Sequence, residues 1–172
     1  MVERTDTSNI KNKESKEYDP ENIEVEDHGF YSVIVLPIRN NKEGRDLVEY
    51  SPDLPKIREL YDGQLKINSV YDLRIFPGRL AGGHYHDNPA RPKFEVCRVI
   101  TGKLSLELID PQTGEKHKEP LLRIQNGKSR VVVIPPGVPH RFVNASKFRR
   151  VKYIIYSTAR CSPDDEIFHP FE

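Results

Sequence analysis

Two histidines one residue apart mark the part of this chain best suited to chemistry. The stretch GGHYHDNPARPKFE runs from Gly82 to Glu95 and places His84 and His86 at positions i and i+2. On a strand, residues two apart point to the same face, so both imidazoles would face one point. A second stretch, IPPGVPHRFVN, supplies His140 behind a proline-rich turn. Three imidazoles and the Glu95 carboxylate are a suitable ligand set for Zn, Mn, Fe or Ni, among which geometry rather than affinity selects.

These residues also allow other roles. Two strand histidines that face solvent are the ordinary alternative for an isolated H-x-H, and Glu95 could equally act as a base in a pocket. Nearby cations could bind a diphosphate, because guanidinium groups match phosphate oxygens in pairs, although each could also be a solvated strand residue. The candidates for this substrate-binding role are Arg74, Arg91, Lys93 and Arg98.

The surrounding sequence predicts an all-β fold that would bring these residues together. From Gly63 onward, short apolar runs with β-branched and aromatic residues are separated by glycine and proline. In KLSLELI, the leucines at 104, 106 and 108 alternate with polar residues, as in a strand with one buried face. The only helix we predict begins near Pro55. Many short strands without a tandem repeat favour a jelly-roll sandwich or closed barrel.

Length and charge limit the organisation and the partners of the chain. With 172 residues and a net charge of +1, we expect one domain and no nucleic-acid or membrane partner. Residues 1–26 are polar and predict a flexible arm, followed by a β-barrel domain over residues 27–172. The first 30 residues hold four basic and nine acidic side chains, so the remainder is basic and suits an anionic small ligand. Two distant cysteines and no long apolar run favour a soluble, cytoplasmic protein.

Two motifs resemble those of the cupin superfamily. They cover residues 82–102, which contain the two histidines, the glutamate and a closing glycine, and residues 127–144, which end in P-x-G-x-x-H-x-x-x-N. Cupins share a small jelly-roll β-barrel and usually hold a metal. The resemblance therefore implies a divalent metal ion bound by His84, His86, Glu95 and His140.

A narrower resemblance covers roughly residues 43–166 and concerns the cupins that act on nucleotide sugars. The order of motifs is similar to that of the dTDP-4-dehydrorhamnose 3,5-epimerases and the related keto-sugar isomerases. In that group a histidine removes a proton beside a ketone and an acid, usually a tyrosine, returns one. The resemblance implies His84 as the base. The chain departs from the pattern near its end, where Arg160 and Cys161 replace the expected tyrosine, so the acid is expected to be Tyr153 or Tyr156.

These observations leave several functions open. The first is an epimerase or isomerase of polysaccharide or deoxysugar biosynthesis that acts on a nucleotide-linked keto-sugar. The second is a metal-dependent cupin of another chemistry, such as an Fe or Ni dioxygenase, and the third is a cupin that binds a sugar without catalysis. The arm and the exposed sheet edges favour a homodimer.

Overall fold

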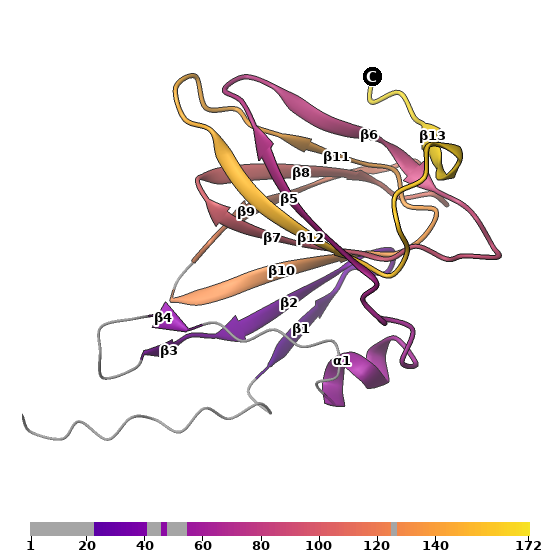
Figure 1. Ribbon diagram of the computed structural model, residues 1–172, viewed down its shortest axis with the longest axis horizontal. Helices are drawn as coiled ribbons and strands as arrows, with labels where there is room; N and C mark the ends of the chain where they lie inside the picture. Colours follow the sequence, from indigo (N-terminus) through magenta and orange to yellow (C-terminus); the bar gives the residue numbers. More distant parts are fainter. Residues whose placement is uncertain (1–22, 41–45, 48–54, 125–126) are drawn as a thin grey trace, which may run out of the picture.

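The computed structural model describes residues 23–40, 46–47, 55–124 and 127–172. Within these ranges, two antiparallel sheets face each other (Figure 1). The six-stranded sheet has the order β1-β2-β10-β7-β12-β5 and the five-stranded sheet the order β13-β6-β11-β8-β9. The six strands are Glu24–Asp27, Ser32–Pro37, Lys128–Ile134, Glu95–Thr101, Val151–Ser157 and Ser69–Ile75. The five strands are Glu166–Phe168, Leu80–His86, His140–Val143, Lys103–Ile109 and Lys116–Leu122.

This arrangement confirms the predicted all-β, jelly-roll class. The two sheets pack as a sandwich whose ladders do not close into one continuous barrel within the described residues. A small third sheet joins β3 (Arg39–Asn40) to β4 (Asp46–Leu47), and one 3-10 turn, η1, spans Pro163–Asp165. No helix in the described part of the chain is long and apolar enough to cross a bilayer.

The space between the sheets is filled by side chains that alternate along the strands. On β8, Leu104, Leu106 and Leu108 are fully buried, while Ser105 and Glu107 between them are half-buried. They pack against inward residues of the six-stranded sheet, such as Cys97 and Val132. Strand periodicity thus places one apolar face of each sheet against the other.

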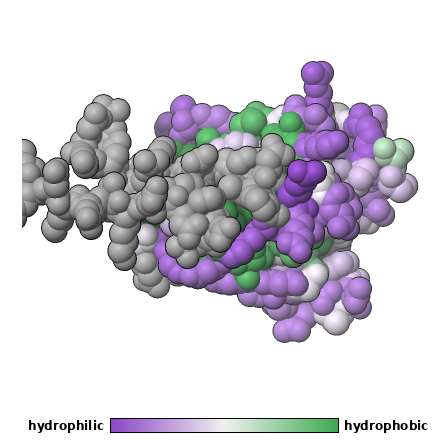
Figure 2. All heavy atoms as spheres, turned by 90° about the horizontal axis from the view of Figure 1, so that it is seen from below, coloured by the Kyte–Doolittle hydropathy of each residue, from purple (hydrophilic) through white to green (hydrophobic). Residues whose placement is uncertain are grey.

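The outer face of the six-stranded sheet carries a second apolar cluster. The predicted helix is confirmed as α1 (Pro55–Leu60), and it buries Ile57 completely against this face. Leu60, at the end of the same helix, is 40% exposed. On the side of the molecule shown in Figure 2, the visible surface is mostly hydrophilic and hydrophobic side chains form only small patches. The buried apolar side chains lie in the two clusters, whereas a few large apolar side chains elsewhere, such as Phe148 and Phe168, are exposed.

The end of the expected N-terminal arm belongs to the sheet. Residues 24–27 form β1, which pairs with β2 in antiparallel register, and Ile23 is 2% exposed. Both terminal guanidinium nitrogens of Arg130 on β10 donate to the Glu26 carboxylate, at 2.8 and 2.7 Å. Residues 24–26, which the sequence analysis assigned to the arm, thus belong to a strand that is paired with β2 and held by an ion pair. The rest of the expected arm, residues 1–22, lies outside the described residues.

Candidate active site

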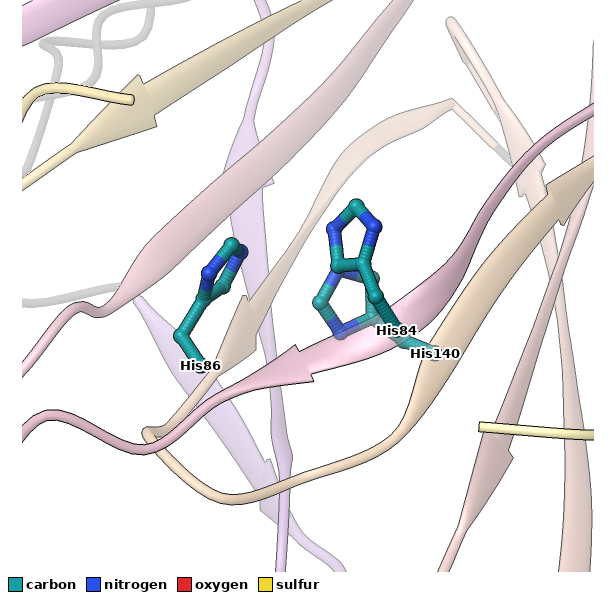
Figure 3. Close-up of side chains that lie close together, drawn as sticks. All are labelled: His84, His86 and His140. Atoms are coloured by element: carbon teal, nitrogen blue, oxygen red, sulfur yellow. The ribbon is translucent and has the colours of Figure 1, made fainter. Parts of the chain in front are cut away.

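Three histidines from two neighbouring strands of the five-stranded sheet meet between the sheets. His84 and His86 come from β6 and His140 from β11, and His140 is the direct cross-strand partner of His84. One ring nitrogen of each lies within 4.8 Å of those of the other two (Figure 3). The i, i+2 spacing thus places both β6 imidazoles on the inner face, as predicted.

A β-bulge at two glycines determines the orientation of these imidazoles. The register between β6 and β11 shifts after His140, so that Gly83 is an extra residue in β6. Gly82 and Gly83 have φ angles of +86° and +91°. A Cβ on Gly82 would lie 3.0 Å from the carbonyl oxygen of His140. The bulge therefore requires glycine, and it lets β6 bend so that His84 faces His140.

Glu95 reaches the histidines from β7 of the opposite sheet. Its Oε1 lies 3.4 Å from Nε2 of His86, and its Oε2 lies 3.1 Å from Nε2 of His140. Neither contact is aligned as a hydrogen bond, since both Nε2 atoms are buried without a hydrogen-bond partner. The ammonium of Lys93, itself 3% exposed, lies 3.2 Å from Oε1. Burial alone raises the pKa of the Glu95 carboxyl, but His140, His86 and Lys93 outweigh it and hold that pKa well below its ordinary value.

The other ring nitrogens of the two buried histidines contact backbone carbonyls. Nδ1 of His86 is 3.1 Å from the carbonyl oxygen of Asp165, and Nδ1 of His140 is 2.9 Å from that of Val138. A carbonyl only accepts, so Nδ1 carries the proton in each ring and Nε2 of a neutral ring presents a lone pair to Glu95. Lone pairs facing a carboxylate repel it. The cluster is therefore built for a cation, either a proton held on an imidazole or a metal ion.

His84 differs from the other two histidines because it borders a cavity and has its own carboxylate. Its side chain is 22% exposed, and its Nδ1 lies 3.7 Å from Oε2 of Glu166 on β13. The other oxygen of Glu166 accepts a hydrogen bond from the thiol of Cys161, at 2.9 Å. Burial, followed by the charges of His140 and His86, lowers the pKa of His84 to about 4. The imidazole is therefore neutral near pH 7.

The cavity beside His84 has a volume of about 220 Å³ and is lined by polar and apolar side chains from both sheets. Lys93, Glu95 and His140 line it together with the phenols of Tyr71 and Tyr153. Tyr71 accepts a hydrogen bond from the backbone N–H of Cys161, at 2.6 Å, which leaves its own hydroxyl proton available. Tyr153 is 2% exposed, and burial raises the pKa of its phenol. The Tyr153 phenol is therefore protonated at neutral pH.

Several residues predicted for substrate binding or catalysis lie away from this cavity. Tyr156 neighbours the inward-facing Ile155 on β12 and packs in the apolar cluster on the outer face of the six-stranded sheet. Arg98 alternates with the inward-facing Cys97 and Val99, and Arg74 is exposed on β5. Arg91 lies on the rim of a separate surface groove. Of the four predicted cations, the structure brings only Lys93 into the cavity.

Sequence reasoning missed the contribution of Tyr71, Asp165 and Glu166. Asp165 and Glu166 lie about 80 residues from the H-x-H stretch, and only the pairing of β13 with the edge of β6 brings them near it. In the sequence SVYDLRI, Tyr71 and Leu73 alternate with the charged Asp72 and Arg74, and this alternation is the one sequence signal that Tyr71 faces inward.

Comparison with known proteins supports the fold. No protein-family model matches the sequence, and no curated protein sequence matches it. Among solved structures, NovW, a 4-keto-6-deoxy sugar epimerase from Streptomyces spheroides, superposes with a TM-score of 0.69 at 17% identity, over 84% of this chain and 72% of NovW. The dTDP-4-dehydrorhamnose 3,5-epimerase from Sulfolobus tokodaii gives 0.68 at 19% identity, over 87% and 82%. QdtA, a sugar 3,4-ketoisomerase from Thermoanaerobacterium thermosaccharolyticum in complex with TDP, gives 0.61 at 16% identity, over 82% and 89%.

The chain has the fold of the nucleotide-sugar epimerases and isomerases. The resemblance predicted from the sequence motifs is thereby confirmed at the level of fold. A shared fold does not determine the chemistry of a site, which depends on the residues present there.

Proposed function

We propose that this protein is an isomerase or epimerase that moves a proton next to the keto group of a nucleotide-linked sugar. The observation that carries the proposal is the placement of His84. This neutral imidazole borders a cavity that is also lined by the phenol-bearing Tyr71 and Tyr153 and by the buried Lys93. Removing a proton from a carbon acid requires a base, a proton donor and stabilisation of an enolate, and the cavity holds one candidate for each.

His84 is the proposed base. Its exposed edge faces the cavity, and the nearby Glu166 carboxylate favours the imidazolium that forms when the ring accepts a proton. His86 and His140 are less suited to this role, because they are 3% and 1% exposed and their Nδ1 atoms are bound to carbonyls. The base is thus the one histidine of the three that a substrate can reach with little rearrangement.

A phenol is the proposed proton donor. Of the two tyrosines predicted for this role, Tyr153 lines the cavity, whereas Tyr156 packs on the outer face of the sheet. Tyr71 is a second candidate, since its hydroxyl oxygen accepts from Cys161 and its proton is left to donate. The ammonium of Lys93 lies at the same cavity and would stabilise an enolate oxygen by its charge.

The proposal is tested by following the conversion of TDP-4-keto-6-deoxyglucose by proton NMR. General-base catalysis contributes about 10²–10⁴-fold to a rate, so His84→Asn is expected to lower kcat by about that factor. A matched control is His117→Asn, which alters a histidine on β9 that does not line the cavity. Unchanged kcat in His84→Asn, or no conversion of any 4-keto sugar nucleotide by the unmodified chain, would count against the proposal.

We propose as a second possibility that the cluster holds a divalent metal ion. The supporting observation is the pair of buried, unpartnered Nε2 atoms on His86 and His140, which face the Glu95 carboxylate. With His84 they would provide three nitrogens and one oxygen, and a bound ion would act as a Lewis acid on a substrate oxygen. The ammonium of Lys93 competes with this arrangement, because it already neutralises Glu95.

Metal content distinguishes the two arrangements. If the ion is present, elemental analysis of protein purified without a histidine tag should find near-stoichiometric metal in the unmodified chain. The His86→Ala variant should have lost that metal. A metal-free protein would mean that protonated imidazole and Lys93 balance the carboxylate, with His84 free to act as the base.

A further inference from the structure

Three large apolar side chains are exposed at one end of the sandwich. Phe76 and Leu80 flank the turn between β5 and β6 and are each more than half exposed, and Phe148, in the loop between β11 and β12, is 90% exposed. Single exposed apolar residues are ordinary, but a patch of them marks a surface that binds a partner. The three form such a patch only if the turn and the loop lie together.

Hydrogen bonds join the turn to the loop. The backbone N–H of Gly78 donates to the carbonyl of Ser146, at 2.9 Å. The side-chain amide of Asn144, which is fully buried, lies within hydrogen-bond distance of three backbone carbonyls, those of Ile75, Phe76 and Arg149, at 3.0, 3.1 and 2.8 Å. The guanidinium of Arg150 lies over the Phe76 ring, 4.6 Å from its centroid. The two segments therefore form one structural unit.

Positive charge surrounds these apolar side chains. We call residues 76–80 and 145–150 together the tip, and Figure 1 shows its two parts side by side, one between β5 and β6 and the other between β11 and β12. The tip contains no acidic residue and four basic ones, Arg79, Lys147, Arg149 and Arg150. All four are exposed, and none of them belongs to an ion pair between described residues. The tip therefore attracts an anionic partner.

A third turn adds a cation and a hollow beside the tip. Gly102, between β7 and β8, packs so closely on the start of β12 that a Cβ there would lie 3.0 Å from Cγ2 of Val151. The hollow between this turn and the loop has a volume of about 580 Å³, and Lys103 and Arg149 line it. None of the described residues that line it is acidic. One phosphate group in the hollow can therefore contact both cations.

We propose that the tip binds the surface of an anionic lipid bilayer, with its apolar side chains among the head groups and its cations on lipid phosphates. Burial of apolar area and attraction to anionic lipids add up at such a surface, and the tip offers both. A bilayer accepts side chains that project from a turn, whereas a protein partner must provide a pocket matched to them. Leu80 favours lipid over nucleic acid, because bases stack on aromatic side chains and not on an aliphatic one.

The position of the tip is compatible with the candidate active site. Strand β6 runs from the tip at Leu80 to the histidine cluster at His86, about 20 Å away at roughly 3.3 Å per residue. A bilayer bound at the tip therefore leaves the cavity at the other end of the strand unobstructed. The net charge of +1 predicts no membrane partner, but that prediction depends on the overall charge and not on where the charges lie. The inference does not depend on the proposed reaction.

The test is co-sedimentation of the full chain with vesicles made of equal parts of phosphatidylcholine and phosphatidylglycerol. The unmodified chain is expected to bind these vesicles, more weakly as the salt concentration rises, and not to bind vesicles of phosphatidylcholine alone. Phe148→Ser should weaken binding about tenfold, because an apolar side chain no longer enters the head-group region. Lys147→Gln/Arg149→Gln should weaken it about 25-fold, since each cation near an anionic surface contributes about fivefold.

Two matched controls should bind like the unmodified chain. Phe168→Ser removes an exposed phenylalanine on β13, and Arg58→Gln/Lys66→Gln removes the same net charge away from the tip. All substituted side chains are exposed, so each variant is expected to fold, and circular dichroism checks this. No binding to the anionic vesicles, or an equal loss in the tip and control variants, would overturn the inference. It would also be overturned by vesicle binding that Phe148→Ser leaves unchanged, or by a chain that binds single-stranded RNA and no vesicle.

Discussion

The buried charges at the site predict that two substitutions lower the free energy of unfolding by different amounts. Glu95 is 5% exposed and is the ion-pair partner of Lys93, which is 3% exposed. In Glu95→Gln, the Lys93 ammonium stays buried without a counter-charge, and such losses destabilise a protein by about 3–5 kcal/mol. In Lys93→Met, the carboxylate keeps His86 and His140, which also hold the pKa of Glu95 below its ordinary value. We expect a loss of about 1–2 kcal/mol there, comparable to one hydrogen bond to a charged group.

Urea unfolding followed by far-UV circular dichroism measures both losses, because the chain contains no tryptophan to report by fluorescence. With an m-value of about 2–3 kcal/mol/M, Glu95→Gln should lower the midpoint by about 1–2 M. Asp72→Asn is the control, since it breaks an exposed ion pair with Lys152 and should cost less than about 1 kcal/mol. A Glu95→Gln variant no less stable than Lys93→Met would refute the reasoning.

Three further perturbations test the supporting structure. Gly82→Ala should unfold at lower urea than Gly78→Ala, by about 1–3 kcal/mol, because both glycines have positive φ but only the Cβ at 82 meets backbone; equal midpoints would contradict the bulge argument. Since Arg130 lowers the pKa of Glu26, their pair should contribute about 1 kcal/mol at pH 7, and this contribution should be lost as the pH falls below the ordinary value of 4.5. Stability curves of the unmodified chain and Glu26→Gln should therefore converge at low pH, and a constant difference would contradict the pairing. Cys161→Ser should retain more keto-sugar conversion than Cys161→Ala, because serine still donates to the carboxylate on β13; equal rates would show that this hydrogen bond does not position the site.

The parts of the fold that could be predicted from the sequence are those whose local pattern matches their final environment. The alternating leucines of β8 and the proline at the start of α1 predict their elements directly. β1 and β13 could not be predicted in this way, because EVED and EIF lack an apolar alternation. Each exists because a neighbouring edge offers backbone hydrogen bonds, and β1 is further held by the ion pair of Glu26 with Arg130.

The candidate site, like the fold, could be predicted from the sequence only in part. The H-x-H spacing predicts that His84 and His86 share a face, and the motif order predicts that His140 joins them. The roles of the tyrosines and arginines depend on which face of a strand each occupies. For Tyr156 the sequence does not indicate the face, because β12 carries large apolar or aromatic side chains on both of its faces. Contacts from the C-terminal segment, such as that of Glu166 with His84, depend on the path of the chain after β12.

The central claim is that this site moves a proton next to a ketone, and deuterium incorporation tests it most directly. TDP-4-keto-6-deoxyglucose would be incubated with the unmodified protein in D2O, and proton NMR would follow the ring hydrogens on the carbons beside the keto group. The account predicts that at least one of them is replaced by deuterium, and that His84→Asn slows the replacement by about 10²–10⁴-fold. A sugar nucleotide that binds but retains all its ring hydrogens would contradict the claim.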